Sequence, residues 1–184
     1  MDYFYLFMKK FFLIDPKLLL YGFFIIFFAS YGQTFFISLF SENIKDHYYL
    51  SDGQFGLIYA IATTLSSLAL VGFAKLIDYI DLRIYSFFIS LGLSIACICM
   101  FVFYDNIFFL FLIIFALRFF GQGAMTHAGE TTMARYFGDN RGKAISFSTF
   151  GGMVGVMLLP FIVVKLSKIL GEQNVWLICA ISLL

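Results

Sequence analysis

Long apolar segments separated by short polar ones make up most of this chain. They predict five complete membrane-spanning helices and part of a sixth, at about residues 18–40, 53–77, 84–104, 107–136, 143–166 and 174–184. As a helix, the last segment would reach only about 16 Å, roughly half of a hydrocarbon core about 30 Å thick. The pattern therefore predicts an all-α integral membrane bundle whose sixth span is incomplete.

Two polar stretches lie outside these spans near the N-terminus. Residues 1–17 contain three lysines and are interrupted by Pro16 before the long apolar run starts. That run is too long for the core of a signal peptide, so 1–17 is predicted to be a cytoplasmic lead. The segment Ser41–Asp52 is predicted to be a polar connection between the first two spans.

Composition supports the membrane class and excludes others. The chain is 62% hydrophobic and 12% charged, whereas soluble domains have about 45–50% apolar and about 25% charged residues. A formal net charge of +1 gives no reason to expect a nucleic-acid partner. Cys97, Cys99 and Cys179 lie in apolar runs without metal-ligand spacing, so we expect no metal and no cofactor. No paired carboxylates or activated nucleophile suggest an enzyme.

The basic residues divide unevenly between the two ends of the predicted spans. The end that holds the N-terminus carries Lys9, Lys10, Lys17, Lys75, Arg83, Arg135, Arg141 and Lys143. The other end carries Lys45, Lys165 and Lys168. Because cytoplasmic loops are enriched in lysine and arginine, we expect a cytoplasmic N-terminus and location in the cell (inner) membrane.

A weak internal repeat relates the first three spans to the next three. Gly32-Gln33 and Gly121-Gln122 are offset by 89 residues, and Gly53-Gln54 and Gly142-Lys143 share that offset. Three spans separate the copies, so the second copy has the opposite topology. This is the pattern of a three-plus-three inverted repeat, as in transporter halves.

Arg118 is the most unusual residue of the apolar spans. It lies about 18 Å into the fourth span, near the middle of the hydrocarbon core, where a cation is costly. It could pair with a polar group of the opposite repeat (Gln33, Tyr31 or Ser30), take part in proton coupling, or bind an anionic substrate, because a guanidinium fork suits a carboxylate. No carboxylate of the chain is expected at its depth.

Two further titratable residues share a face of the fourth span. His127 and Glu130 are one helical turn apart, which suggests a proton relay. The alternative is a hydrated Glu130 that pairs with Arg135 or Arg83 near the cytoplasmic end.

Small and hydroxyl-bearing residues inside the spans have simpler interpretations. Gly151 and Gly155 have the spacing of small residues at close helix contacts. The serines and threonines of the second span are expected to satisfy backbone groups or to pack.

Three motifs along these spans resemble signatures of the major facilitator superfamily. The turn after the second span keeps Leu76, Asp78 and Arg83 of the family pattern Gly-x-Leu-Ala-Asp-Arg-x-Gly-Arg-Arg/Lys, but departs from it at Ala74, Tyr79, Asp81 and Leu82. In the fourth span, Arg118 to Gly123 is similar to Arg-x-x-Gln/Gly-Gly. The following loop, Arg141 to Ala144, matches Arg-Gly-Lys/Arg-Ala fully.

The resemblance implies the N-terminal six-helix half of a transporter, facing a missing C-terminal six-helix half. In the family, the loop aspartate and its basic neighbours form a cytoplasmic latch, which here would involve Ala74, Asp78, Arg83 and Arg141. We expect this latch to be weaker where Tyr79 and Leu82 replace basic residues. From its position alone, Asp78 could instead cap the third span.

The sequence thus predicts a secondary active transporter that works by alternating access. We expect the substrate to be a small organic anion that enters with protons, on the basis of Arg118 and a loose resemblance to monocarboxylate porters. The substrate site is expected near the midplane of the membrane. The candidate substrate and coupling residues are Arg118, Gln122, Gln33, Tyr31, His127 and Glu130. A competing hypothesis is a non-transporting membrane scaffold or partner-binding subunit. Because the cavity would lack the wall formed by the second half, we expect these 184 residues alone not to transport.

Overall fold

The computed structural model describes residues 14–102 and 106–184, and within them every regular element is helical. The elements are α2 (Pro16–Ala29), η1 (Ser30–Gly32), α3 (Thr34–Ser38), α4 (Ser41–Tyr48), α5 (Asp52–Phe73), η2 (Ala74–Asp78), α6 (Leu82–Val102), α7 (Ile107–Ala116), η3 (Leu117–Met125), α8 (Thr126–Tyr136), η4 (Gly138–Asn140), α9 (Arg141–Leu170) and α10 (Glu172–Ser182). This confirms the predicted all-α class.

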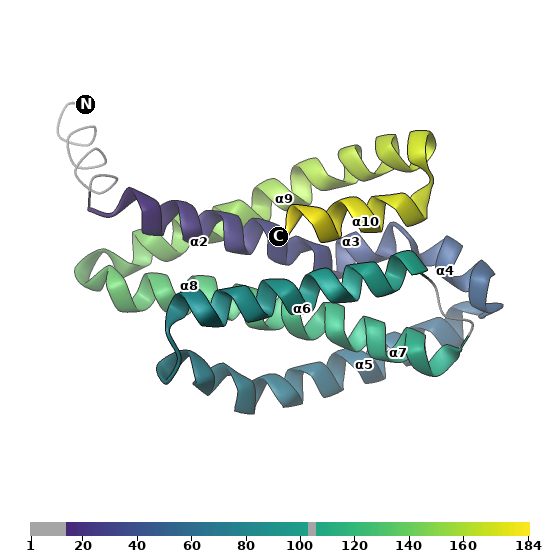
Figure 1. Cartoon of the computed structure of the whole chain (residues 1–184), viewed down its shortest axis with the longest axis horizontal. Coiled ribbons are helices and arrows are strands. Elements are labelled where there is room, and N and C mark those ends of the chain that lie inside the picture. Colours follow the sequence, from purple (N-terminus) through teal and green to yellow (C-terminus); the bar gives the residue numbers. More distant parts are fainter. Residues whose placement is uncertain (1–13, 103–105) are drawn as a thin grey trace.

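Among the described residues, five helical stretches are long and apolar enough to cross a membrane: Pro16–Ser38, Asp52–Asp78, Leu82–Val102, Ile107–Tyr136 and Gly138–Leu170. They lie along the long axis of the molecule, and the shorter α10 packs beside α6 (Figure 1). The start of α2, the α5–α6 turn and the α8–α9 turn lie at one end, at the left of Figure 1. These segments carry the described basic residues that the sequence analysis placed on the side of the N-terminus. They are Lys17, Lys75, Arg83, Arg135, Arg141 and Lys143.

The first helix begins slightly earlier than predicted. Asp15 accepts a hydrogen bond from the Leu18 backbone N–H through Oδ1 (2.9 Å), and Pro16 occupies the first turn. A side-chain acceptor before a helix and a proline inside its first turn are both favourable, so Pro16 and Lys17 join the helix and not the predicted lead. Residues 1–13 of that lead, and residues 103–104 of the third predicted span, lie outside the described residues.

The connection between the first two spans is also more ordered than predicted. Ser41–Tyr48 forms α4, and Tyr49 ends it in the left-handed conformation (φ 54°). Ser51 and Gln54 then form a capping box at the start of α5, each side chain accepting a hydrogen bond from the backbone N–H of the other residue. The left-handed Tyr49 thus ends α4, which has no side-chain cap at its start, and the capping box begins α5 two residues later.

Glycines let α9 pack tightly on α2. A Cβ added at Gly151 would collide with the Phe23 carbonyl oxygen, and one added at Gly155 would collide with Ser30 Oγ. The close helix contact predicted from the spacing of these glycines is confirmed.

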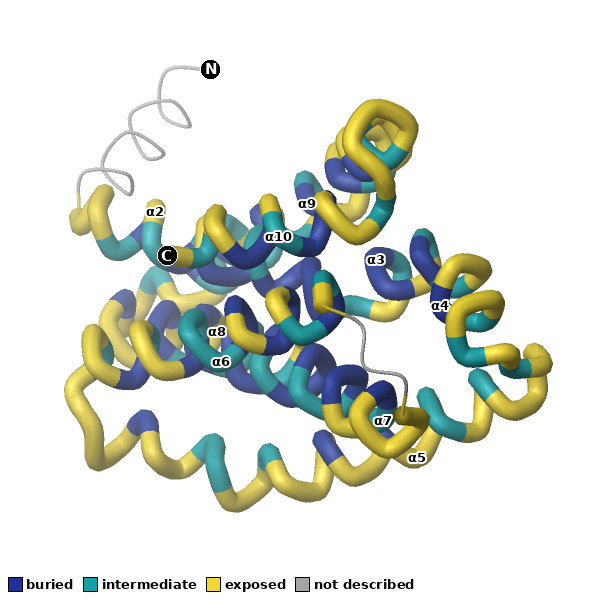
Figure 2. Tube along the Cα trace, turned by 45° about the vertical axis from the view of Figure 1, so that its right-hand side comes forward, coloured by how far each residue is buried: buried dark blue, intermediate teal, exposed yellow. Residues whose placement is uncertain are grey.

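Burial is uneven across the bundle (Figure 2). Only 11% of the most apolar window of Asp52–Asp78 and 17% of that of Gly138–Leu170 are buried, against 44% of that of Ile107–Tyr136. The window of Pro16–Ser38 is also 44% buried, so the first and fourth spans are the most enclosed, whereas α5 and α9 expose long apolar faces to lipid or to a partner.

Two irregular segments meet at the centre of the bundle. The first span, predicted as one continuous helix, is interrupted at Gln33, whose backbone is extended (φ −79°, ψ 153°). The fourth span is π-helical over Leu117–Met125. Gly32 of η1 and Gly121 of η3 bring the two backbones into direct contact, because a Cβ built on Gly121 would lie only 2.6 Å from Gly32 Cα.

Candidate functional site

Arg118 is held beside the interruption of the first span. Its side chain lies in the π-helical segment and is only 6% exposed. Arg118 Nη1 donates hydrogen bonds to the carbonyl oxygen of Gly32 (3.1 Å) and to Thr34 Oγ1 (3.2 Å). The break at Gln33 makes this possible, because it frees a backbone carbonyl that a continuous helix would use internally.

Tyr59 of α5 completes the surroundings of this guanidinium. Its ring centroid lies 5.4 Å from Arg118 Cζ, and its hydroxyl donates a hydrogen bond to Thr34 Oγ1 (3.0 Å). Sequence reasoning missed both Tyr59 and Thr34. No motif marks either residue, and their proximity to Arg118 depends on how three spans pack.

The prediction that Arg118 pairs with Gln33, Tyr31 or Ser30 was wrong, although its actual partners in the first span, Gly32 and Thr34, are their neighbours in the chain. The Tyr31 hydroxyl instead shares a hydrogen bond with Ser182 Oγ of α10 (3.0 Å). Ser30 is buried at the contact with Gly155, and Gln33 is half-buried. The physical reason is the helix break, which offers the Gly32 carbonyl and turns Thr34 toward Arg118.

One edge of the guanidinium has no partner within the described residues. Arg118 Nε is buried without a hydrogen bond, and none is formed by Nη2. Nη1 binds protein on the other side of the guanidinium, and the unpaired Nε and Nη2 donors lie side by side on the remaining edge. Two parallel N–H donors match the two oxygens of a carboxylate, so this edge has the geometry of bidentate anion recognition.

A small cavity adjoins Arg118. This Arg118 cavity, about 130 Å³, is lined by Ser66, Ser67, Leu70, Arg118, Gln122 and Gly123. Ser66 and Ser67 donate their hydroxyl hydrogens to the Thr63 carbonyl oxygen, so their lone pairs face outward as acceptors. With the bond from Thr64 Oγ1 to the Ala60 carbonyl oxygen, they show that three hydroxyls of the second span satisfy backbone groups, whereas Thr63 Oγ1 is buried without a partner within the described residues. Gln122 is exposed beside the cavity.

Thr34 and Tyr59 line a second cavity. This Lys45 cavity, about 280 Å³, is lined by Thr34, Ile37, Ser38, Ser41, Lys45, Asp52, Phe55, Gly56 and Tyr59. Lys45 Nζ donates to Asp52 Oδ1 (2.6 Å) at its margin. This hydrogen bond raises the pKa of Lys45 above its ordinary value. The lysine therefore stays protonated at neutral pH.

The two titratable residues farther along the fourth span do not line either cavity. His127 Nε2 shares a hydrogen bond with Thr131 Oγ1 (3.2 Å), while His127 Nδ1 is buried without a partner in the described chain. Glu130 is exposed, and Arg135, one of its two predicted partners, binds Asp78 instead. The expected pairing of Glu130 with Arg135 is thus replaced by a contact between two different spans.

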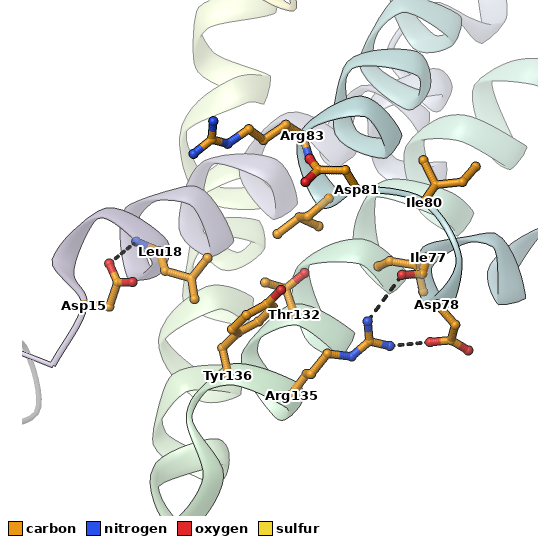
Figure 3. A pocket seen from close by; sticks show the side chains of 11 residues that line it. Asp15, Leu18, Ile77, Asp78, Ile80, Asp81, Arg83, Thr132, Arg135 and Tyr136 are labelled. Carbon is orange, nitrogen blue, oxygen red and sulfur yellow. Dashed lines mark hydrogen bonds and ion pairs between the residues drawn. The ribbon is translucent and has the colours of Figure 1, made fainter.

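Two of the four residues of the predicted latch, Asp78 and Arg83, line one cavity at the turn between α5 and α6, whereas Ala74 and Arg141 do not line it (Figure 3). A cavity of about 700 Å³ lies there, lined by Asp15, Leu18, Ile77, Asp78, Ile80, Asp81, Leu82, Arg83, Thr132, Arg135 and Tyr136. Arg135 Nη2 forms an ion pair with Asp78 Oδ1, and Nη1 donates to the Ile77 carbonyl oxygen (3.3 Å). Ala74 begins η2, and Arg141 is exposed at the start of α9.

The capping role suggested for Asp78 belongs to a different aspartate. Asp81 Oδ1 accepts a hydrogen bond from the Arg83 backbone N–H (2.8 Å) at the start of α6. Asp81 lies immediately before the first helical residue, Leu82, whereas Asp78 still belongs to η2. Asp78 is therefore left free to bind Arg135 of α8.

Replacing Arg135 by glutamine is expected to lower the free energy of unfolding by less than about 1 kcal/mol, because partly exposed ion pairs are screened by water. The two side chains are 43% and 54% exposed. The measurement is the unfolding midpoint in mixed detergent micelles, with Arg141→Gln as a control that removes an exposed cation at the same end. A loss of several kcal/mol beyond the control would contradict this view of the pair.

Comparison with known proteins agrees with this architecture. The family model described as Major Facilitator Superfamily matches residues 22–184. No curated protein and no solved structure matches the chain. The family match begins inside the first membrane-spanning stretch and includes the other four stretches and all of the Arg118 site. This chain, an integral membrane protein by its helices, belongs to the major facilitator superfamily of membrane transporters.

Proposed function

We propose that the chain forms one half of a secondary active transporter for a small organic anion, and that Arg118 binds the anion's carboxylate. The observation that carries this proposal is that Nε and Nη2 of Arg118, a residue only 6% exposed, have no hydrogen-bond partner within the described residues. The Arg118 cavity beside it, about 130 Å³, has room for a solute the size of about four water molecules.

The electrostatics of the span support an anionic ligand. Arg118 forms no ion pair with any carboxylate among residues 14–102 and 106–184. Carbonyl and hydroxyl oxygens stabilise its charge in part, but a cation at this depth gains much more from a full negative charge. A substrate carboxylate would supply that charge and would occupy the donors that the protein leaves unused.

Alternating access requires a second wall for the site. The exposed faces of α5 and α9 supply a surface on which the C-terminal six-helix half would pack. Gln122 and Ser67 are exposed next to Arg118, so the solute would lie between the two halves. The basic residues near one end support an inner-membrane protein with a cytoplasmic N-terminus.

Proton coupling is assigned in this proposal to His127. Its Nδ1 is buried without a hydrogen-bond partner in the described chain, and Glu130 lies exposed one turn away. Histidine side chains serve as proton shuttles in proteins, so this unpaired ring nitrogen makes His127 the candidate for a relay. Gln33 and Tyr31 remain candidates only as supports of the first span beside the Gly32 carbonyl.

Binding of a charged ligand and its uncharged isostere tests the anion site directly. The chain would be reconstituted in lipid nanodiscs and titrated with propionate and with propionamide, using ligand-observed NMR to measure both affinities. Propionate is expected to bind at least about tenfold more tightly, because only the carboxylate satisfies both guanidinium donors and the buried charge.

Either of two results would contradict the proposal. Equal affinity for propionate and propionamide would show that charge is not recognised, and Arg118 would then have a structural role. Absence of binding by a panel of small carboxylates would favour the non-transporting scaffold that the sequence left open.

A further inference from the structure

Thr34 has an unusual set of hydrogen bonds. Its Oγ1 accepts one from Arg118 Nη1 (3.2 Å) and another from the Tyr59 hydroxyl (3.0 Å). A threonine hydroxyl offers two acceptor lone pairs and one donor. Both lone pairs of Thr34 are therefore in use, and Thr34 links Tyr59 to Arg118.

Tyr59 acts on the same guanidinium in a second way. Its ring centroid is 5.4 Å from Arg118 Cζ, within the range of a cation–π interaction. The ring restricts the position of the guanidinium, while the hydroxyl positions Thr34, which receives Nη1. One side chain of α5 thus constrains Arg118 both directly and through the first span.

These contacts decide which donors of Arg118 remain available. With Nη1 bound to Gly32 and Thr34, the unpaired edge is formed by Nε and Nη2, and Arg118 lines the Arg118 cavity. Thr34 and Tyr59 line the Lys45 cavity instead. The Tyr59–Thr34 hydrogen bond therefore joins two residues that line the Lys45 cavity, and through Thr34 it anchors a guanidinium that lines the Arg118 cavity.

We propose that Tyr59 is a positioning residue for the anion site, acting on Arg118 through Thr34 and through its ring. The inference rests on the proposed function, since it concerns how the anion-binding edge is oriented. Without the Tyr59 hydroxyl, Thr34 loses the partner that fixes its rotamer, and Arg118 Nη1 keeps only the Gly32 carbonyl as a firm acceptor. The solute then meets a guanidinium that is less well ordered.

A double-mutant cycle tests this chain of contacts, with propionate affinity in nanodiscs as the readout. Tyr59→Phe, which keeps the ring, is expected to weaken binding about fivefold, in the range of one hydrogen bond near a charged group. Thr34→Val is expected to have a similar or larger effect. In the Thr34→Val background, Tyr59→Phe should have no further effect, because the hydroxyl acts only through Thr34.

Conservative and severe variants sharpen the test. Thr34→Ser keeps the hydroxyl and should restore most of the affinity, whereas Tyr59→Leu also removes the ring and should cost about tenfold more than Tyr59→Phe. Thr64→Val is the matched control. Thr64 lies on α5, as Tyr59 does, but its hydroxyl donates a hydrogen bond to the Ala60 carbonyl oxygen and not to a residue of the Arg118 site. Its propionate affinity should equal that of the unchanged chain.

The outcomes separate this inference from the proposed function. Failure of the unchanged chain to bind propionate or any other small carboxylate of the panel overturns both. Propionate binding with an additive cycle, or with Tyr59→Phe indistinguishable from Thr64→Val, overturns the positioning role alone. If affinity and unfolding midpoint fall together in every variant, Thr34→Ser included, Tyr59 stabilises the bundle and does not position Arg118, and the positioning role is again overturned.

Discussion

Substitution of Arg118 by lysine is expected to weaken propionate binding by at least about tenfold while the helical fold is retained. Lysine keeps the positive charge but presents an ammonium in place of a planar fork. A single ammonium can replace one of the contacts to Gly32 and Thr34, but it cannot at the same time offer the paired Nε and Nη2 donors. The charge alone therefore does not preserve recognition.

Affinity and fold must be measured on the same preparation. Circular dichroism and the unfolding midpoint would show whether the bundle persists, and the affinity would come from the NMR titration. Lys165→Arg serves as the control, because it exchanges one cation for another at an exposed position of α9. Its affinity for propionate should be unchanged. Unaltered propionate binding by the Arg118→Lys variant would show that the fork is not used and would return Arg118 to a purely structural role.

Substitution of Gly32 by alanine is expected to lower the free energy of unfolding by about 3 kcal/mol or more, since a methyl group placed against backbone atoms cannot be relieved by side-chain movement. The added Cβ would collide with the Leu117 carbonyl oxygen and would lie 2.8 Å from Gly121 Cα. Gly121→Ala is expected to behave similarly, because its Cβ would lie 2.6 Å from Gly32 Cα. Both changes would push η1 and η3 apart at the Arg118 site.

Gly72→Ala provides the matched comparison. Gly72 lies inside α5 with nothing within 4 Å of an added Cβ. Because alanine favours helix over glycine, this variant should be neutral or more stable by about 0.5–1 kcal/mol. The unfolding midpoint in mixed micelles measures all three variants. If Gly32→Ala and Gly72→Ala have the same midpoint, the close contact between the two irregular segments is not tight in the membrane.

The inverted repeat and the close contact concern the same residues. The offset of 89 positions that suggested the repeat relates Gly32 to Gly121, and these two glycines touch in the structure. Residues related by a pseudo-two-fold axis can contact each other only where they lie on that axis. The repeat thus could have indicated which backbones meet, but the helix break and the π-helical segment beside them left no trace in the hydrophobic pattern.

From the sequence alone, the membrane class, the spans and the presence of a cation, Arg118, inside the fourth span could be predicted. Segment length and hydrophobicity decide whether a helix can cross a bilayer, and a lone cation in such a segment stands out in any composition count. The close helix contact at Gly151 and Gly155 of α9 could also be predicted, because closely packed helices carry small residues four positions apart. These properties are encoded within one segment at a time.

The partners of charged groups were decided only by the tertiary structure. Arg118 binds the Gly32 carbonyl and Thr34 and lies against Tyr59, and Asp78 binds Arg135 of a distant span. Each of these contacts depends on the rotation and axial position of one helix relative to another. A shift of a single residue along a helix turns a side chain by about 100°. The hydrophobic pattern constrains that rotation only loosely, whereas the packing of Gly32 on Gly121 sets it directly.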